Sequence, residues 1–315
     1  MADVALIDYG TREQWLAARA KSIGASESAA MFGLAPPGRE TPYSLWARKS
    51  GLYLPTNDYN EAMEWGHLHE PLIADVYQRR TQHRLWAPPS PYCVAVHPKL
   101  PFLTATIDRW IIYAPEYPGQ GELEIKNVSA FAQDWRKDDV IQVPLYVQVQ
   151  VQHQLAVTGF RWASVAALIG GNRLEIIPVE RNDEFIEALE DKAADFWRRV
   201  ERGDPPPLDG YEASTKAVKS RHPDDNGESI ELTTTAADLW QELQQAKEAE
   251  EKAKLRADQA ENRLRDLIGP NTYGVLPDGR RLTLFTTVKP GYTRTVGPQK
   301  YRSLRLEKVR PRKRK

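Results

Sequence analysis

The sequence predicts a mixed α/β fold that carries a long helix and a β-hairpin at its C-terminal end. Short apolar runs typical of strands alternate with helical periodicity between residues 92 and 202. A second helical pattern continues from 233 to 268, and a turn-centred pair of short strands follows it. The chain has 315 residues, enough for about two domains at roughly 150 residues each. We therefore expect a mixed central sheet flanked by helices, with a smaller C-terminal extension.

Residues 1–207 are expected to form the main unit. Thr41-Pro42 places proline at the first position of a helix, and Gly51 ends that helix. A small-residue segment after Gly24 starts another short helix. The other expected helices span 12–20, 60–82, 144–158 and 183–202, and the expected strands span 92–96, 103–107, 110–113, 121–126, 162–169 and 173–178.

The C-terminal third is expected to form three further segments. Residues 208–232 are polar and rich in Gly, Asp and Ser, which is typical of a linker. Residues 233–268 form a long helix or coiled-coil arm, and 269–315 hold a small β-hairpin with a basic tail. The tail suits phosphate contacts, and a disordered solubilising end is the alternative. The positions of the helix that alternate four and three apart are Leu239, Leu243, Ala246, Glu250, Ala253, Ala257, Ala260, Leu264 and Leu267.

The composition excludes several classes of protein. Lys+Arg 43 and Asp+Glu 43 give a formal net charge of zero, which argues against a histone-like protein but leaves room for a local basic groove. No apolar run reaches the roughly 18 residues of a membrane span, and the first residues lack the apolar core of a signal peptide. The single cysteine, Cys93, excludes an internal disulfide framework and a cluster held by four cysteines of one chain. We expect a cytoplasmic protein with no membrane association.

One short strand carries the most informative side chains. In Glu122-Leu-Glu124-Ile-Lys126 the side chains alternate, so Glu124 and Lys126 project from one face of the strand. Asp108 ends an apolar strand sixteen positions before Glu124. Two carboxylates and a lysine in this arrangement can hold Mg²⁺, which prefers oxygen ligands, and support phosphodiester hydrolysis. Glu122 shares the face and is an alternative ligand, and a solvated ion pair is the alternative interpretation of the whole pattern.

The order of several motifs resembles a known family. The motifs are Ile23-Gly-Ala-Ser-Glu-Ser-Ala-Ala30, Thr41–Gly51, Met63-Glu-Trp-Gly-His-Leu-His-Glu-Pro71 with Tyr77, Leu103–Asp108 with Glu124-Ile-Lys126, and Pro144–Gly159. Over residues 12–200 the chain resembles the phage-type alkaline exonucleases, the lambda-exonuclease and YqaJ viral recombinase group of the PD-(D/E)xK nuclease superfamily. This resemblance implies a restriction-endonuclease-like core. The chain departs from the family pattern at Arg109, where a glycine usually follows the catalytic aspartate.

The resemblance implies roles for individual residues in catalysis. It makes Asp108 and Glu124 metal ligands, with Glu70 as the helix-borne acid that completes the site. Lys126 becomes the catalytic lysine. Gln150 becomes the glutamine that positions the water or the scissile strand, although it also fits the polar face of an amphipathic helix. The implied metal is Mg²⁺, with Mn²⁺ as a substitute.

A second pair of residues is implied to bind the DNA end. Arg19 and Ser26 resemble the pair that captures the 5′-terminal phosphate. Ser26 stands near an expected helix N-terminus, where free N–H groups and the helix dipole favour anions. For Arg19 a plain surface arginine is the alternative.

The implied function is a Mg²⁺-dependent 5′–3′ exonuclease on linear double-stranded DNA, which leaves 3′ single-stranded overhangs for phage-type recombination. The implied partners are double-stranded DNA ends, further copies of the chain in a trimeric ring, and a single-strand annealing protein. The implied location is the cytoplasm of a bacterium or of a phage-infected host. One alternative is a structure-specific or other endonuclease on the same core. Another is a non-catalytic DNA-binding or scaffold protein, which the intact Asp108, Glu124 and Lys126 argue against.

Overall fold

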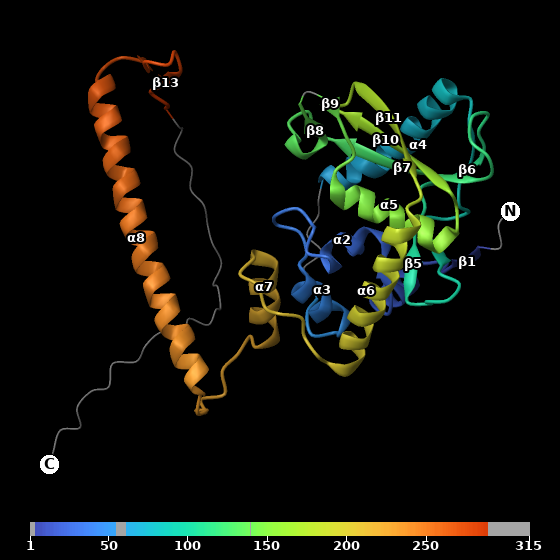
Figure 1. Ribbon diagram of the computed structural model, residues 1–315, viewed down its shortest axis with the longest axis horizontal. Coiled ribbons are helices and arrows are strands. Elements are labelled where there is room, and N and C mark those ends of the chain that lie inside the picture. The colour runs from blue at the N-terminus through green and yellow to red at the C-terminus, as the bar shows by residue number, and fades with distance from the viewer. Residues whose placement is uncertain (1–3, 55–60, 139, 289–315) are drawn as a thin grey trace. The chain divides into compact units, whose positions relative to one another are not determined.

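The computed structural model describes residues 4–54, 61–138 and 140–288, and its elements are labelled in Figure 1. The chain divides into two compact units, Met1–Pro223 and Asp224–Lys315. The expected basic tail, Lys308 and 310–315, lies outside the described residues. Each unit is described separately below.

A five-stranded mixed sheet forms the centre of the first unit. In spatial order it runs β11 (Arg173–Glu180), β10 (Trp162–Ile169), β7 (Gly121–Val128), β6 (Arg109–Tyr113) and β3 (Arg84–Trp86). Strands β7 and β10 pair in parallel, with Glu124 opposite Val165, and the other neighbours pair antiparallel. Parallel neighbours need a crossover connection, and helix α5 (Leu145–Thr158) lies between β7 and β10 along the chain.

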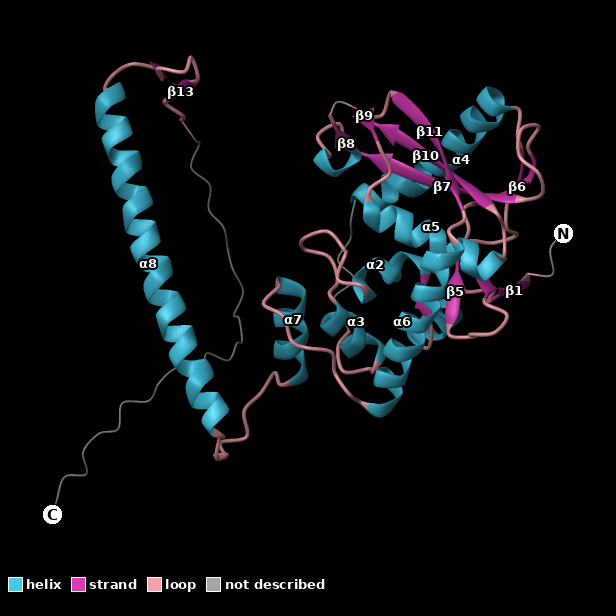
Figure 2. Cartoon of the chain, in the orientation of Figure 1, coloured by secondary structure: helices cyan, strands magenta, loops and turns pink. Residues whose placement is uncertain are grey.

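Helices pack on both faces of this sheet, as Figure 2 shows in cyan. Helix α4 (Glu61–Thr81) contacts β7 on one face, where Ile73 and Tyr77 share a core cluster with Leu123. Helix α5 packs on the opposite face. Because side chains alternate along β7, Leu123 is directed toward α4 whereas Glu124 contacts α5.

A second, four-stranded sheet forms the other layer of the first unit. Its order is β1 (Ala5–Asp8), β4 (Cys93–Val96), β5 (Leu103–Ala105) and β2 (Ile23–Gly24). The remaining helices of this unit are α1 (Arg12–Ala20), the 3₁₀ turn η1 (Ala25–Glu27), α2 (Ser28–Met31), α3 (Pro42–Lys49), α6 (Asp183–Arg202) and α7 (Glu212–Arg221). The 3₁₀ turn η2 (Gln133–Trp135) and the short strands β8 (Arg136–Lys137) and β9 (Val140–Ile141) follow β7. Strand β5 belongs to the second sheet and β6 to the first, so the chain passes between the layers at residues 106–108.

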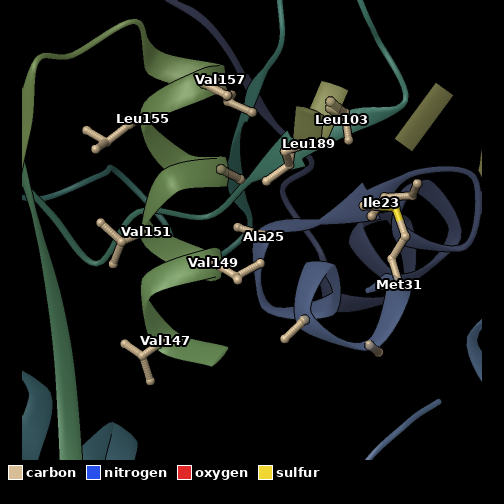
Figure 3. Packing of buried hydrophobic residues seen from close by; sticks show 14 of the residues in the cluster. Ile23, Ala25, Met31, Leu103, Val147, Val149, Val151, Leu155, Val157 and Leu189 are labelled. Carbon is tan, nitrogen blue, oxygen red and sulfur yellow. The ribbon is translucent and has the colours of Figure 1, made fainter. Parts of the chain in front are cut away.

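Helix α5 is the central element of the packing. Figure 3 shows Val151 and Leu155 pointing to one side of the helix and Val149 and Val157 to the other, with Val149 facing the segment that carries Ala25. All five of these residues are at most 4% exposed. A helix that is apolar on more than one side is buried between layers. Helix α5 therefore joins the five-stranded sheet to η1, α2 and β5.

A polar contact lies inside this apolar environment. The Oγ of Ser28 and the Nδ1 of His153 are 2.5 Å apart, and both residues are fully buried. Burial lowers the pKa of His153 to about 4, because the charged imidazolium loses its hydration there. His153 is therefore neutral in the folded protein at neutral pH.

The expected mixed α/β fold is confirmed, and most expected elements lie within two residues of their predicted bounds. The short strands β1, β2, β3, β8 and β9 were not predicted. The expected linker 208–232 contains a helix, α7, which packs on α3. The hydroxyls of Thr41 and Ser214 are 2.6 Å apart, and Arg221 donates to the Tyr43 hydroxyl at 2.7 Å. Helix α7 is polar because only one of its sides is buried. The boundary between the two units comes just after α7.

The second unit contains the long helix α8 (Thr234–Ile268) and the hairpin β12 (Tyr273–Val275) and β13 (Arg281–Thr283). None of the residues of α8, all of which are described, is buried. The hairpin is closed by an edge-to-face contact between Tyr273 and Phe285. Among the helices that the structure describes, none has both the length and the apolar character needed to cross a bilayer.

The buried histidine predicts an acid-sensitive contribution to stability. The unfolded chain protonates His153 near its ordinary pKa of 6.5, whereas the folded protein does so only near 4. Between these values the unfolded state binds more protons, so stability is lost as pH falls from about 6.5 toward about 4. His153→Gln should lose less stability over this interval than the unsubstituted protein. Urea unfolding at pH 7, 6, 5 and 4 measures the difference, and parallel curves for the two proteins would contradict it.

Candidate active site

A cleft of about 870 Å³ opens in the first unit. It is lined by residues from α1, η1 and α4, and from the segment where the chain passes from β5 to β6. The predicted site residues in the lining are Arg19, Ser26, Glu70, Asp108 and Gln150. Glu124 and Lys126 do not line it, but both contact Gln150. The structure therefore brings the seven predicted residues together: five line the cleft, and Glu124 and Lys126 form its floor beneath Gln150.

Asp108 lies just before β6 and is tied to β7. The backbone N–H of Ile125 donates to its Oδ2 at 2.7 Å. Burial and the nearby carboxylates of Glu124 and Glu70 raise the pKa of Asp108 well above its ordinary value. Strands β6 and β7 pair with Arg109 opposite Leu123, which brings Asp108 beside the Glu124 strand. The predicted convergence of two carboxylates from adjacent strands follows from this register.

Glu124 is 3% exposed and has a donor at each carboxylate oxygen. Its Oε1 lies 2.5 Å from the Nζ of Lys126 and accepts from the Nε2 of Gln150 at 2.7 Å. Lys126 also donates to the Oε1 of Gln150 at 3.1 Å. The three side chains therefore form a closed ring. Burial alone would lower the pKa of Lys126, but Glu124 and Asp108 outweigh it and raise that pKa, so Lys126 is a cation.

Gln154 completes this cluster and was not predicted. Its Nε2 donates to the Oε2 of Glu124 at 2.7 Å. Gln150 and Gln154 stand four residues apart on α5, so their side chains project from the same side of the helix. That spacing is visible in the sequence. Helix α5 carries two further glutamines, which point elsewhere: Gln148 donates to the carbonyl of Val143 and Gln152 to that of Glu180.

Glu122, the alternative ligand, lies on the same face of β7 and is fully buried, whereas Glu124 contacts Gln150, which lines the cleft. Burial and the charges of Glu124 and Asp108 raise its pKa well above its ordinary value. A carboxyl group in such surroundings favours its neutral form. The geometry therefore favours Glu124 over Glu122 as the acidic group that serves the cleft.

Glu70 faces the cleft from α4 but is held by a cation. Its Oε1 lies 2.6 Å from a guanidinium nitrogen of Arg109. The same nitrogen of Arg109 donates to the backbone carbonyl of Asp108. Both side chains are partly exposed, 17% for Arg109 and 28% for Glu70. The predicted third acid thus lies at the cleft, paired with Arg109.

The donor set fits a hard divalent cation in its chemistry. Asp108, Glu124 and Glu70 supply carboxylate oxygens, the ligands that Mg²⁺ prefers. Burial, and after it the charges of Glu124 and Glu70, raise the pKa of Asp108, and a bound cation would offset both. Among the residues that the structure describes, however, no three His, Cys, Asp or Glu side chains are grouped as a metal site. The carboxylates are instead paired with protein cations and amides.

Arg19 and Ser26, the pair predicted to bind a phosphate, are in contact at another wall of the cleft. A guanidinium nitrogen of Arg19 donates to the Oγ of Ser26 at 3.2 Å. The guanidinium carbon lies 5.1 Å from the ring centroid of Trp15, which adds a cation–π contact. Ser26 stands in a 3₁₀ turn of three residues rather than at the start of a long helix. The side-chain pair, more than a helix dipole, therefore supplies the positive charge.

Glu27 anchors this wall and was not predicted. It is buried and forms ion pairs with Arg19 at 3.2 Å, Arg48 at 2.9 Å and Lys49 at 2.7 Å. Burial alone would raise the pKa of Glu27, but these cations outweigh it and lower that pKa. Burial lowers the pKa of Lys49 to about 8. The sequence places Glu27 next to Ser26, but carries no sign that its carboxylate is buried among cations.

Two comparisons relate the sequence to known proteins. A family model described as the YqaJ-like viral recombinase domain matches residues 14–161. An uncharacterized protein named YqaJ from Bacillus subtilis (strain 168) is 30% identical over 274 residues, which cover 84% of this chain and 81% of that protein.

A comparison of structures finds similar chains at low sequence identity. An alkaline exonuclease, LHK-Exo, from Laribacter hongkongensis is 20% identical, with a TM-score of 0.45, over 61% of this chain and 94% of that one. A phage related exonuclease from Haemophilus somnus 129PT is 10% identical, with a TM-score of 0.41, over 57% of this chain and 94% of that one.

The contact between Gln154 and Glu124 predicts a cost in stability. Gln154→Leu leaves one oxygen of a buried carboxylate without this donor, and we expect a loss of about 1–3 kcal/mol in the free energy of unfolding. Gln148→Leu is the comparison on the same helix: it removes one hydrogen bond, to the carbonyl of Val143, from an exposed side chain and leaves the buried carboxylate untouched, so its loss should be smaller, about 0.5–1 kcal/mol. Urea unfolding of both variants at pH 7 measures the effect. If both variants lost the same free energy of unfolding, the contact with Glu124 would not be the cause.

Proposed function

The chain belongs to the YqaJ-like viral recombinase family, and on that premise we propose that it is a Mg²⁺-dependent 5′–3′ exonuclease. Its substrate would be the end of linear double-stranded DNA, and its product a 3′ single-stranded overhang for phage-type recombination. The observation that carries the proposal is the position of two groups on one cleft. The Asp108–Glu124–Lys126 cluster suits hydrolysis, and the Arg19–Ser26 pair suits a terminal phosphate.

The proposed ligands of the metal are Asp108, Glu124 and Glu70. Bound there, Mg²⁺ (or Mn²⁺ in its place) supplies a Lewis acid that polarises a phosphoryl oxygen and lowers the pKa of a water. The support for this part of the proposal is the carboxylate chemistry of the donor set and the burial and neighbouring charges that raise the pKa of Asp108.

The residues of the chain supply the other requirements of hydrolysis. Lys126 is held as a cation beside Glu124, where its charge stabilises the negative charge that develops on the phosphoryl group. Gln150 contacts both residues and also lines the cleft, so its amide can orient a water or the scissile strand. Gln154 fixes the second oxygen of Glu124 and acts through it as a positioning residue.

The Arg19–Ser26 pair supports an end-specific reaction. Arg19 presents a partly exposed guanidinium, and the Ser26 hydroxyl lies within hydrogen-bond distance of it. A guanidinium and a hydroxyl together match the oxygens of a terminal phosphomonoester. An enzyme that requires such an end digests from it, whereas an endonuclease does not need it.

The proposal extends to partners and location. We include a trimeric ring of identical chains, a single-strand annealing protein and the cytoplasm of a bacterium or a phage-infected host. Family membership supports these assignments. The exposed surface of α8 leaves room for contacts with a further chain.

End preference tests the direction of digestion. Linear duplexes with 5′-phosphate or 5′-hydroxyl ends and a closed circular duplex are incubated with Mg²⁺ or with EDTA. We expect Mg²⁺-dependent release of nucleotides from linear DNA, faster from the 5′-phosphate end. Nicking of the circle would indicate an endonuclease, and no release under any condition would indicate a non-catalytic protein.

Substitution of the lysine tests the chemistry. Lys126→Ala should reduce nucleotide release by about 100-fold or more, because a charge directed at the transition state is lost. Binding of a 5′-phosphorylated duplex, measured by fluorescence anisotropy in EDTA, should survive. Lys192→Ala, an exposed lysine on α6, is the control and should retain activity. Full activity of Lys126→Ala would exclude this lysine from the mechanism.

A further inference from the structure

Arg109 is a charged residue of the cleft lining that the proposed mechanism does not use. It directly follows Asp108 and lines the cleft together with Glu70. Its guanidinium is a cation, which changes the electrostatics around the carboxylates. Arg109 therefore places a positive charge beside the proposed metal ligands.

The polar contacts that the structure describes for the Arg109 side chain are with Glu70 and Asp108. One nitrogen of its guanidinium contacts both the Oε1 of Glu70, at 2.6 Å, and the carbonyl of Asp108. An ion pair that is largely removed from water is stronger than one on the surface, and these side chains are mostly shielded. The guanidinium thus occupies Oε1, one of the two carboxylate oxygens that Glu70 could offer to a metal, and its positive charge opposes a cation at the other.

The other two proposed ligands are fixed more firmly. Asp108 accepts from the backbone N–H of Ile125, and Glu124 is held at both oxygens by Lys126, Gln150 and Gln154. Glu70 stands on a different element, α4, and its ion pair in the described structure is with Arg109. Among the contacts that the structure describes, Glu70 is therefore the acid on a separate helix that is held through one side chain, that of Arg109.

We propose that Arg109 holds Glu70 in the metal-free protein and competes with the divalent cation for its carboxylate. The inference rests on the proposed metal dependence. Arg109 is a positioning residue in this role, since it acts through Glu70. Two consequences follow: Arg109 weakens metal binding, and this effect requires the carboxylate of Glu70.

Binding of Mn²⁺ to the full chain without DNA tests the proposal, with isothermal titration calorimetry as the readout. Four proteins form a cycle: unsubstituted, Arg109→Gln, Glu70→Gln and the double variant. We expect Arg109→Gln to bind Mn²⁺ at least about fivefold more tightly. In the Glu70→Gln background the same substitution should change the affinity by about twofold or less. Arg202→Gln removes an equal charge outside the cleft lining and should leave the affinity unchanged.

The outcomes separate this inference from the proposed function. Unchanged or weaker Mn²⁺ binding by Arg109→Gln overturns the inference alone, as does an equal gain in the Glu70→Gln background. No Mn²⁺ binding by any of the proteins overturns both the inference and the metal dependence. Circular dichroism confirms folding of each variant. If Arg109→Gln does not fold, Arg109→Met, which keeps an aliphatic side chain but removes the charge, replaces it, and a gain in affinity that requires Glu70 supports the inference, whereas no gain overturns it.

Discussion

The structure of the cleft depends on the burial of one charged side chain, Glu124. A carboxylate removed from water is costly unless donors compensate for it, and three side chains do so here: Lys126 from the same strand, and Gln150 and Gln154 from α5. This requirement explains the unusual sequence of α5. Its valines pack against the two layers, while glutamines one turn apart meet the carboxylate. Packing and chemistry are therefore specified by the same helix.

Two clusters of buried charge face one cleft, and each is organised around a glutamate. Glu27 pairs with three cations, one of which also pairs with Glu40, and Arg19 of this group lies beside Ser26 in the cleft lining. Around Glu124 burial and the neighbouring acids raise the pKa of Asp108. The cleft thus has a guanidinium and a hydroxyl on one wall and carboxylates on another side. Neither the formal net charge nor any single motif describes this contrast.

Much of the fold and of the site could be predicted from local patterns. Alternation along β7 placed Glu124 and Lys126 on one face, and the motif order assigned Asp108, Glu70 and Gln150 to the cleft that the structure contains. What could not be predicted depends on contacts between distant segments. Helix α7 was not predicted, because it lies in a polar segment and only its side against α3 is buried. Glu70 and Arg109 are 39 positions apart in the sequence, and no periodic pattern predicts their ion pair.

The passage of the chain between the two sheets at residues 106–108 places the two groups of the cleft on different layers. Ser26 follows the edge strand of the four-stranded sheet, and Glu124 belongs to the five-stranded one. Helix α5 packs against both layers, so its buried side chains set the separation between these two residues. A change in the volume of those side chains would alter that separation without a change at Ser26 or Glu124.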